Sequence, residues 1–149
     1  DRAGVLEQIK ARRKDAEKYI YPQRQYADIV IRYFDETLIN EPAKAGRLSE
    51  IHLNVEFVMD VGINVEPLLA LMRDRDVKGV LSYDDPLHQK VTFGWEEIGR
   101  NGRTWAKLAA AAIPQIEDLT GGRAVWEDGA DGLVQLMLLL VISELMKRD

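Results

Sequence analysis

The chain has 149 residues, of which 46% are hydrophobic and 30% charged, and it contains no cysteine. This composition fits one globular domain with a sizeable core and excludes a disordered tail, a collagen-like rod and a disulfide-stapled miniprotein. The net charge of −5 argues against a nucleic-acid partner, because binding backbone phosphates requires a basic surface. The longest apolar run, residues 136–142, is far shorter than the roughly 20 residues that cross a bilayer. We therefore expect no membrane partner and a cytoplasmic protein.

The opening part of the chain is basic, and its pattern predicts a helix followed by a strand. Residues 1–32 hold eight Lys and Arg against five Asp and Glu, whereas the remainder holds twelve against twenty. Apolar residues recur at helical spacing over 3–19, and Tyr21-Pro22 is expected to end that helix, because proline lacks an N–H. Residues 27–34, ADIVIRYF, are typical of a strand buried on both faces, as in a parallel sheet.

The chain changes character near residue 40. A loop is predicted at 40–46, followed at 48–59 by alternating apolar and polar residues, the pattern of a half-exposed antiparallel strand. We therefore divide the chain into residues 1–40, a last helix and strand of a larger core, and residues 41–149, an extension of that core. The two parts are expected to form one compact unit.

The extension is predicted to contain helices around a short hairpin. A helix is expected at 65–74, strands at 78–83 and 89–93 with a turn between them, and a helix beginning near Trp105 that Pro114 interrupts and Gly121-Gly122 ends. Asp131 is expected to cap a buried final helix at 132–148. The predicted fold class is α/β, with antiparallel strands extending a buried parallel-type strand and helices covering the sheet.

The sequence offers few groups for catalysis. It contains no GxxxxGK[ST] phosphate loop, no GxGxxG, no HExxH and no nucleophile elbow. His52 and His88 are 36 residues apart and are interpreted as a solvated strand and a turn residue, and Asp84-Asp85 as a turn. The acidic residues at 127–131 lack the spacing of a calcium loop. We accordingly predict no catalytic residue and no metal ligand within this chain.

The basic run of Lys10, Arg12, Arg13 and Lys14 is the one candidate binding site. On a helix, positions 10, 13 and 14 are neighbours, and guanidinium groups match phosphate oxygens in a bidentate manner. A solvated helix face with local pairing to Asp15 and Glu17 explains the same pattern. The residues alone leave both interpretations open.

Residues 19–31 read YIYPQRQYADIVI, which resembles the phosphoribulokinase and uridine kinase family of P-loop kinases. The ARRKD run at 11–15 is similar to the corresponding run of phosphoribulokinases, as is GLVQ at 132–135 in the final helix. The length after residue 31 also favours phosphoribulokinase over uridine kinase within that family. The resemblance is specific over about 30 residues and weak but collinear over the remainder.

The resemblance implies the C-terminal part of a phosphoribulokinase, the Calvin-cycle enzyme that transfers the ATP γ-phosphate to ribulose 5-phosphate with Mg²⁺. It implies that Arg12, Arg13 and Lys14 bind the substrate phosphate, next to an upstream kinase core that supplies the phosphate loop, and that the parent enzyme is a homodimer. This chain alone is then expected to be inactive and to hold no cofactor. Two alternatives remain, a uridine-kinase-like fragment and a non-catalytic assembly or regulatory module.

Overall fold

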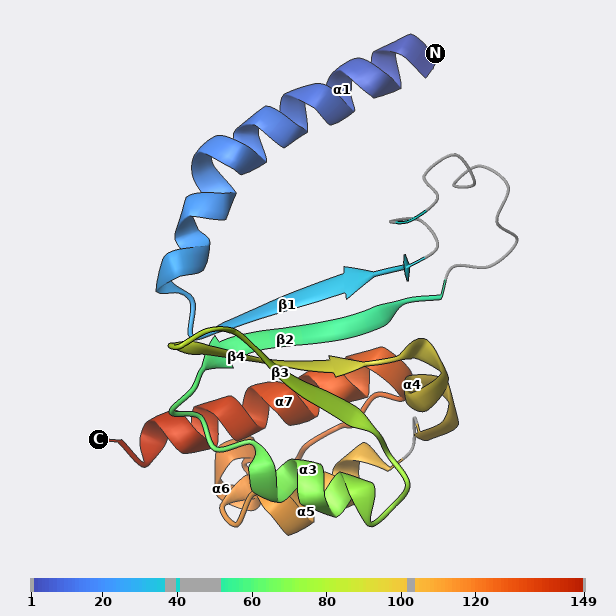
Figure 1. Ribbon diagram of the computed structural model, residues 1–149. Helices are drawn as coiled ribbons and strands as arrows, with labels where there is room; N and C mark the ends of the chain where they lie inside the picture. Colours follow the sequence, from blue (N-terminus) through green and yellow to red (C-terminus); the bar gives the residue numbers. More distant parts are fainter. Residues whose placement is uncertain (1, 37–39, 41–51, 102–103, 149) are drawn as a thin grey trace.

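The computed structural model describes residues 2–36, 40, 52–101 and 104–148. In this part of the chain, four strands form one antiparallel sheet with the order β1-β2-β4-β3. Figure 1 shows helices on one side of the sheet and a long N-terminal helix extending away on the other. The predicted loop at 40–46 lies outside the described residues except for residue 40.

The helices and strands follow one another along the chain as an α/β arrangement. In order they are α1 (Arg2–Asp15), η1 (Ala16–Ile20), η2 (Tyr21–Tyr26), β1 (Ile29–Phe34), β2 (Asn54–Asp60), α3 (Glu66–Arg73), β3 (Gly79–Asp85), β4 (His88–Phe93), α4 (Trp95–Asn101), α5 (Trp105–Ala112), α6 (Ile116–Thr120) and α7 (Gly129–Met146).

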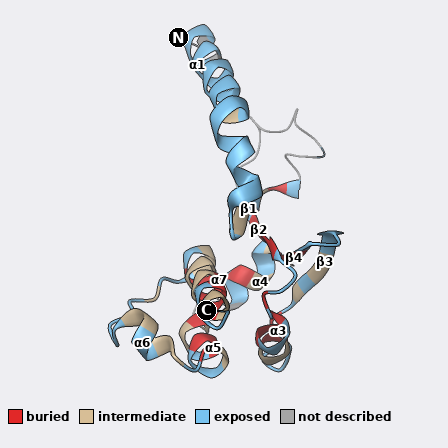
Figure 2. Ribbon diagram, turned by 90° about the vertical axis from the view of Figure 1, so that its left-hand side faces the viewer, coloured by how far each residue is buried: buried red, intermediate tan, exposed pale blue. Residues whose placement is uncertain are grey.

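The N-terminal helix lies apart from the hydrophobic core. Figure 2 shows the described residues of α1 exposed, and Val5 and Ile9 are each more than half exposed. The helical path does not break at Tyr21-Pro22 as predicted, but passes through a π-helical turn, η1, into the 3-10 helix η2. Pro22 is accommodated because it occupies the first turn of η2, where no N–H is needed.

Strand β1 forms an edge of the sheet and pairs with β2 in an antiparallel manner, Ile31 opposite Phe57. It was predicted to be buried on both faces, but its residues are half-buried or exposed. The reason is that, among the described residues, β1 has a neighbouring strand on one side only. A parallel strand of a kinase core along its free edge stays a prediction.

Strand β2 is the most buried strand, although its alternating sequence predicted a half-exposed one. Every residue from Asn54 to Met59 is buried. Val55, Phe57 and Met59 belong to the core cluster, as predicted from the apolar positions. The polar positions are buried as well because β2 lies between β1 and β4, whose long side chains cover them.

The hairpin of β3 and β4 is confirmed at its predicted position, with Leu81 opposite Val91. The turn depends on Asp85, whose Oδ1 accepts hydrogen bonds from the N–H groups of Leu87 (2.8 Å) and His88 (3.0 Å). The interpretation of the paired acids as turn residues is therefore correct for Asp85.

The core lies between the sheet and the helices. Its largest buried side chains include Trp105, Phe57, Phe93, Leu108 and Leu136. Pro114 separates α5 from α6, and Gly121 ends α6 in the left-handed conformation with φ +61°, both as predicted. The sequence pattern missed α4, and it placed the start of α7 three residues late. Asp131 is consequently a first-turn residue of α7 and not its cap.

Helix α7 packs on α4, α5 and α6 and contributes Leu133, Leu136 and Met137 to the core. By length and composition alone it could cross a membrane, with 39% of its 18 residues buried inside the protein. Its inner face is thus part of the core.

Candidate functional site

The face of the sheet turned away from α3–α7 is called the outer face. Its side chains are fixed by the register, because positions opposite one another point the same way while neighbours along a strand alternate. The outer face carries Val30, Arg32 and Phe34 from β1, Asn54, Glu56 and Val58 from β2, His88, Lys90 and Thr92 from β4, and Val80 and Ser82 from β3. Asp84 lies at the irregularity between Tyr83 and Asp85, and its carboxylate reaches Lys90 of this face.

A row of alternating charges crosses the outer face. Glu56 of β2 forms ion pairs with Arg32 of β1 at 3.5 Å and with Lys90 of β4 at 3.8 Å. Lys90 also forms an ion pair with Asp84 of β3 at 2.8 Å. Glu56 is the buried member of the row, with its side chain 11% exposed. The hydrogen bond to Asp84, followed by the charge of Glu56, raises the pKa of Lys90. The row therefore links all four strands by charge.

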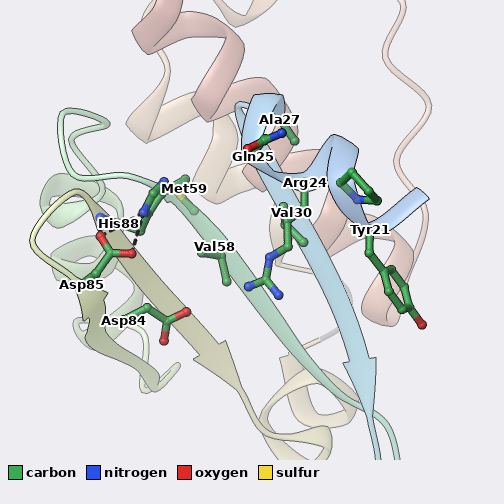
Figure 3. Close-up of a pocket in the computed structure, with 11 residues that line it drawn as sticks. Tyr21, Arg24, Gln25, Ala27, Val30, Val58, Met59, Asp84, Asp85 and His88 are labelled. Carbon is green, nitrogen blue, oxygen red and sulfur yellow. Dashed lines mark hydrogen bonds and ion pairs between the residues drawn. The ribbon is translucent and has the colours of Figure 1, made fainter. Parts of the chain in front are cut away.

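Next to this row a cavity of about 520 Å³ opens between η2 and the tip of the β3–β4 hairpin. Its lining combines an apolar floor with polar walls. Figure 3 shows the Arg24 side chain reaching from η2 over Val30 into the space that Asp84 faces, with Asp85 and His88 beyond it. The size is within the range of small-molecule sites.

A second hollow of about 810 Å³ lies beside the first and shares Arg24, Val30 and Val58 with it. It continues along β1 to Arg32 and Glu56. Arg24 thus stands between the two hollows and lines both.

The far wall of the cavity is a histidine–aspartate pair. Nδ1 of His88 lies 2.8 Å from Oδ2 and 2.9 Å from Oδ1 of Asp85. The hydrogen bond from His88, with those of the turn N–H groups, lowers the pKa of Asp85. Asp60 is held in a similar way, because the N–H of Gly62 and the guanidinium of Arg148 lower its pKa. Each of these carboxylates is therefore an anion matched by local donors.

The predicted phosphate-binding residues Arg12, Arg13 and Lys14 lie together on the exposed α1 helix. Lys10, Arg13 and Lys14 line one hollow on that helix, as their spacing predicts. Nε of Arg13 pairs with Oε1 of Glu17 at 3.1 Å while remaining 77% exposed. The structure thus gathers these cations on α1, apart from the cavity whose lining begins at Tyr21.

The other histidine lies at the opposite end of the outer face. The ring of His52 stacks on Trp95 with centroids 4.0 Å apart, and the backbone N–H of His52 donates to Oδ2 of Asp35 at 2.9 Å. Oδ1 of Asn54 accepts a hydrogen bond from the backbone N–H of Trp95 at 2.9 Å. His52 therefore packs against a ring and is more than a solvated strand residue.

The acidic loop before α7 has a structural role. Gln135 accepts the N–H of Glu127 at 2.9 Å and donates to the carbonyl of Val125 at 3.1 Å, which ties the loop to α7. Among the residues that the structure describes, no three His, Asp or Glu side chains gather as a metal site would require.

Sequence reasoning missed Arg24 and Glu56 as site residues. Arg24 was considered only as part of the 19–31 segment that resembles the kinase family. No residue pattern near it in the sequence indicates that η2 places it over the sheet. Glu56 was assigned to a solvated face. A signal for it did exist, since Glu56 and Lys90 fall on the same face of β2 and β4 once these two strands are paired.

Comparison with known proteins adds one match. Residues 1–40 match the model of the Phosphoribulokinase / Uridine kinase family. The matched part holds α1, η1, η2 and β1, and with them Arg12, Arg13, Lys14 and Arg24. The kinase-family relation is thus supported for this segment of the chain. No curated protein and no solved structure matches the chain.

Proposed function

We propose that this chain is the C-terminal part of a phosphoribulokinase-like enzyme, which transfers the γ-phosphate of ATP to ribulose 5-phosphate. The observation that carries the proposal is the family match over residues 1–40, which contains the exposed basic run of α1. Phosphoryl transfer depends on cations placed around the transferred group and the acceptor. Arg12, Arg13 and Lys14 supply such cations on a helix that extends from the sheet.

In this proposal the upstream kinase core binds ATP, and α1 and β1 are the segments that meet it. Mg²⁺ is proposed to bind in that core as well, because it is usually held by the nucleotide phosphates together with one or two carboxylates. Arg12, Arg13 and Lys14 bind the phosphate of the sugar and shield its charge without moving a proton. The parent enzyme is proposed to be cytoplasmic and a homodimer, for which β1 and β3 are the two sheet edges in the described part of the chain.

The test compares acceptors in the full-length protein. ADP release is followed with ATP and Mg²⁺ and either ribulose 5-phosphate or uridine. Turnover with ribulose 5-phosphate at about 1 s⁻¹ or faster is expected, and the isolated 149-residue chain should give none. Turnover with uridine alone would assign the chain to a nucleoside kinase. Activity with neither acceptor would favour a non-catalytic module.

The role of the basic run is tested separately in the full-length enzyme. Arg13→Ala and Arg12→Ala are expected to lower kcat/KM for the sugar phosphate by about 10- to 1000-fold, because a charge-assisted contact is lost. Arg13→Lys should restore part of it, since an ammonium cannot reproduce the bidentate fork. Arg123→Ala, an exposed arginine after α6, is the control. Wild-type kinetics in both α1 variants would make the run a solvated helix face.

A further inference from the structure

A hollow of about 630 Å³ lies on the outer face, at the end of the sheet away from η2 and the hairpin tip. Strands β1 and β4 both end here, because each is antiparallel to β2 and the two therefore run in the same direction. Figure 1 shows α4 at this end of the sheet, directly after β4. The lining thus comes from segments that are distant in the sequence and meet where the strands end.

Carboxylates predominate in this lining. The charged residues that line the hollow are Lys78, Asp35, Glu36, Glu96 and Glu97. Asp35 and Glu97 each accept a backbone N–H, at 2.9 and 3.1 Å, and Glu97 also pairs with Arg100 at 3.9 Å. Glu36 and Glu96 are exposed, and neither forms an ion pair within the described part of the chain. The hollow therefore has an excess of negative charge, which favours a cationic ligand.

The two unpaired carboxylates come from opposite sides of the hollow. Glu36 follows β1 and Glu96 follows β4, with β2 between these strands. Neighbouring strands lie about 4.8 Å apart, so the two backbones are separated by roughly 10 Å. Among the described residues no three His, Asp or Glu side chains gather as a metal ion would require. The separation suits an extended organic cation better than a metal ion.

An exposed indole ring belongs to the same lining. Trp95 is 42% exposed, although the ring of His52 stacks on it. Exposed Val80 adds a further apolar surface. A guanidinium can lie against an aromatic ring while its fork pairs with a carboxylate, whereas an ammonium is a strongly hydrated point charge. The combination of Trp95 and Glu96 therefore favours arginine among organic cations.

A buried hydrogen-bond donor also opens onto the hollow. Asn54 is only 7% exposed, and its Oδ1 accepts the backbone N–H of Trp95. Its Nδ2 has no hydrogen-bond partner among the described residues. Every fully enclosed side-chain nitrogen and oxygen in that part of the chain has a partner, so this amide group faces the hollow that Asn54 lines. A peptide carbonyl would satisfy it, and a simple polyamine has no acceptor to offer.

We propose that this hollow binds a basic peptide segment of a partner protein. One arginine of the segment lies against Trp95 and pairs with Glu96, a second cation pairs with Glu36, and a carbonyl of the peptide backbone accepts the Asn54 amide. The site lies on a different part of the chain from the basic run of α1. It does not rest on the proposed enzymatic activity.

Isothermal titration calorimetry with the 149-residue chain measures the binding. The probes are the peptide Ac-Gly-Arg-Gly-Arg-Gly-NH2, the same peptide with glutamine in place of both arginines, and spermidine. The glutamine peptide is expected to bind at least about tenfold more weakly than the arginine peptide, because both charge-assisted contacts are lost. Equal binding of the two peptides, or no binding of the arginine peptide at about 10 mM, would overturn the site. Tighter binding of spermidine would make the ligand a polyamine and the peptide assignment wrong.

Variants then locate the peptide on the protein. Glu96→Gln and Glu36→Gln should each weaken the arginine peptide by about three- to tenfold. Glu117→Gln is the matched control, because Glu117 is an exposed acid in the first turn of α6 as Glu96 is in that of α4. Wild-type affinity in both test variants would contradict the proposal. If the chain alone self-associates and Glu96→Gln prevents this, the occupant is a second copy and the partner assignment is wrong.

Nuclear magnetic resonance provides a readout that does not depend on a variant. The side-chain amide of Asn54 and the indole N–H of Trp95 should shift as the arginine peptide is added. The indole N–H of buried Trp105, which donates to the carbonyl of Gly129 at 2.8 Å, should stay unchanged. A shift of Trp95 without one of Asn54 would show that a cation binds without the peptide backbone, and the peptide assignment would then be wrong.

Discussion

Glu56 is a carboxylate buried in the middle of a sheet, and its environment explains why it is tolerated there. Arg32 and Lys90 lie on either side of it at 3.5 and 3.8 Å. A buried charge is costly when unmatched, and removing one member of such a group leaves the others uncompensated. The stability of the sheet therefore depends on the whole row of charges and not on any one pair.

Glu56→Ala is expected to lower the free energy of unfolding by about 1–3 kcal/mol, less than for a fully buried group because Arg32 is half exposed. Glu56→Gln should cost less, since it keeps the volume and a hydrogen-bond acceptor. Urea denaturation measures both variants. Glu7→Ala, an exposed acid on α1, should stay within about 0.5 kcal/mol. If Glu56→Ala also changes the free energy of unfolding by no more than Glu7→Ala does, the row of charges contributes nothing to stability.

Asp60 predicts how stability responds to acid. The N–H of Gly62 at 2.7 Å, then Arg148, lower its folded pKa below the ordinary value of 3.8. A lowered folded pKa adds stability that is present above the unfolded pKa and is lost as pH falls through the folded one. Asp60→Asn should therefore destabilise the protein at pH 7 and reduce the loss of stability between about pH 4 and pH 2. Urea denaturation at several pH values tests this prediction, with Asp28→Asn as the exposed control. If the free energy of unfolding changes with pH in the same way for the wild type and Asp60→Asn, the prediction is wrong.

At the scale of elements, the sequence pattern succeeded where the signal is local. Pro114, Gly121 and the Asp85 turn act through their own backbone geometry, so their effects could be predicted without tertiary structure. The burial of β2 could not be predicted in this way, because it depends on which strands lie beside β2. The cavity could not be predicted either, since Arg24 and Asp84 are 60 positions apart in the sequence and line one cavity only because of where η2 lies.

The GLVQ segment, at the start of α7, contains a glycine that allows this helix to pack closely against the preceding loop. A Cβ added to Gly132 would overlap the carbonyl oxygen of Glu127 and lie 2.5 Å from Cδ1 of Trp105. Gly132 therefore lets α7 approach the loop that Gln135 fastens by two hydrogen bonds. The segment that resembled a family motif has a packing role in this fold.

Gly132→Ala is expected to lower the free energy of unfolding by about 1–3 kcal/mol, because overpacking outweighs the gain in helix propensity. Gly99→Ala is the matched control, since Gly99 lies in α4 with no heavy atom within 4 Å of an added Cβ. That change should be neutral or stabilise by up to about 1 kcal/mol. Urea denaturation distinguishes the two, and equal effects at both glycines would contradict the close-approach argument.

On the scale of the whole molecule, stability is concentrated in residues 52–148. The described side chains of α1, η1 and η2 contribute nothing to the core cluster, and Figure 2 shows α1 standing clear of it. The part that matches a kinase family is thus attached to the core chiefly through β1, which packs Ile29 and Ile31 against it.

Removal of residues 1–26 is expected to leave a cooperatively folded protein. The loss should be a few degrees in Tm at most, because η1 and η2 contain no buried residue and give no side chain to the core cluster. Circular dichroism on heating measures it. A truncated chain that no longer melts cooperatively would show that α1–η2 is part of the folding unit.

The strand order β1-β2-β4-β3 also sets the sequence in which the sheet opens. The hairpin of β3 and β4 closes a very short loop, whereas β1 is joined to β2 by a much longer segment and has a single neighbour among the described strands. Amide protons of β1 should accordingly exchange with solvent through a local opening, before those of β2 and β4, which require global unfolding. We therefore expect the segment from α1 to β1 to separate from β2 without melting the domain that carries it.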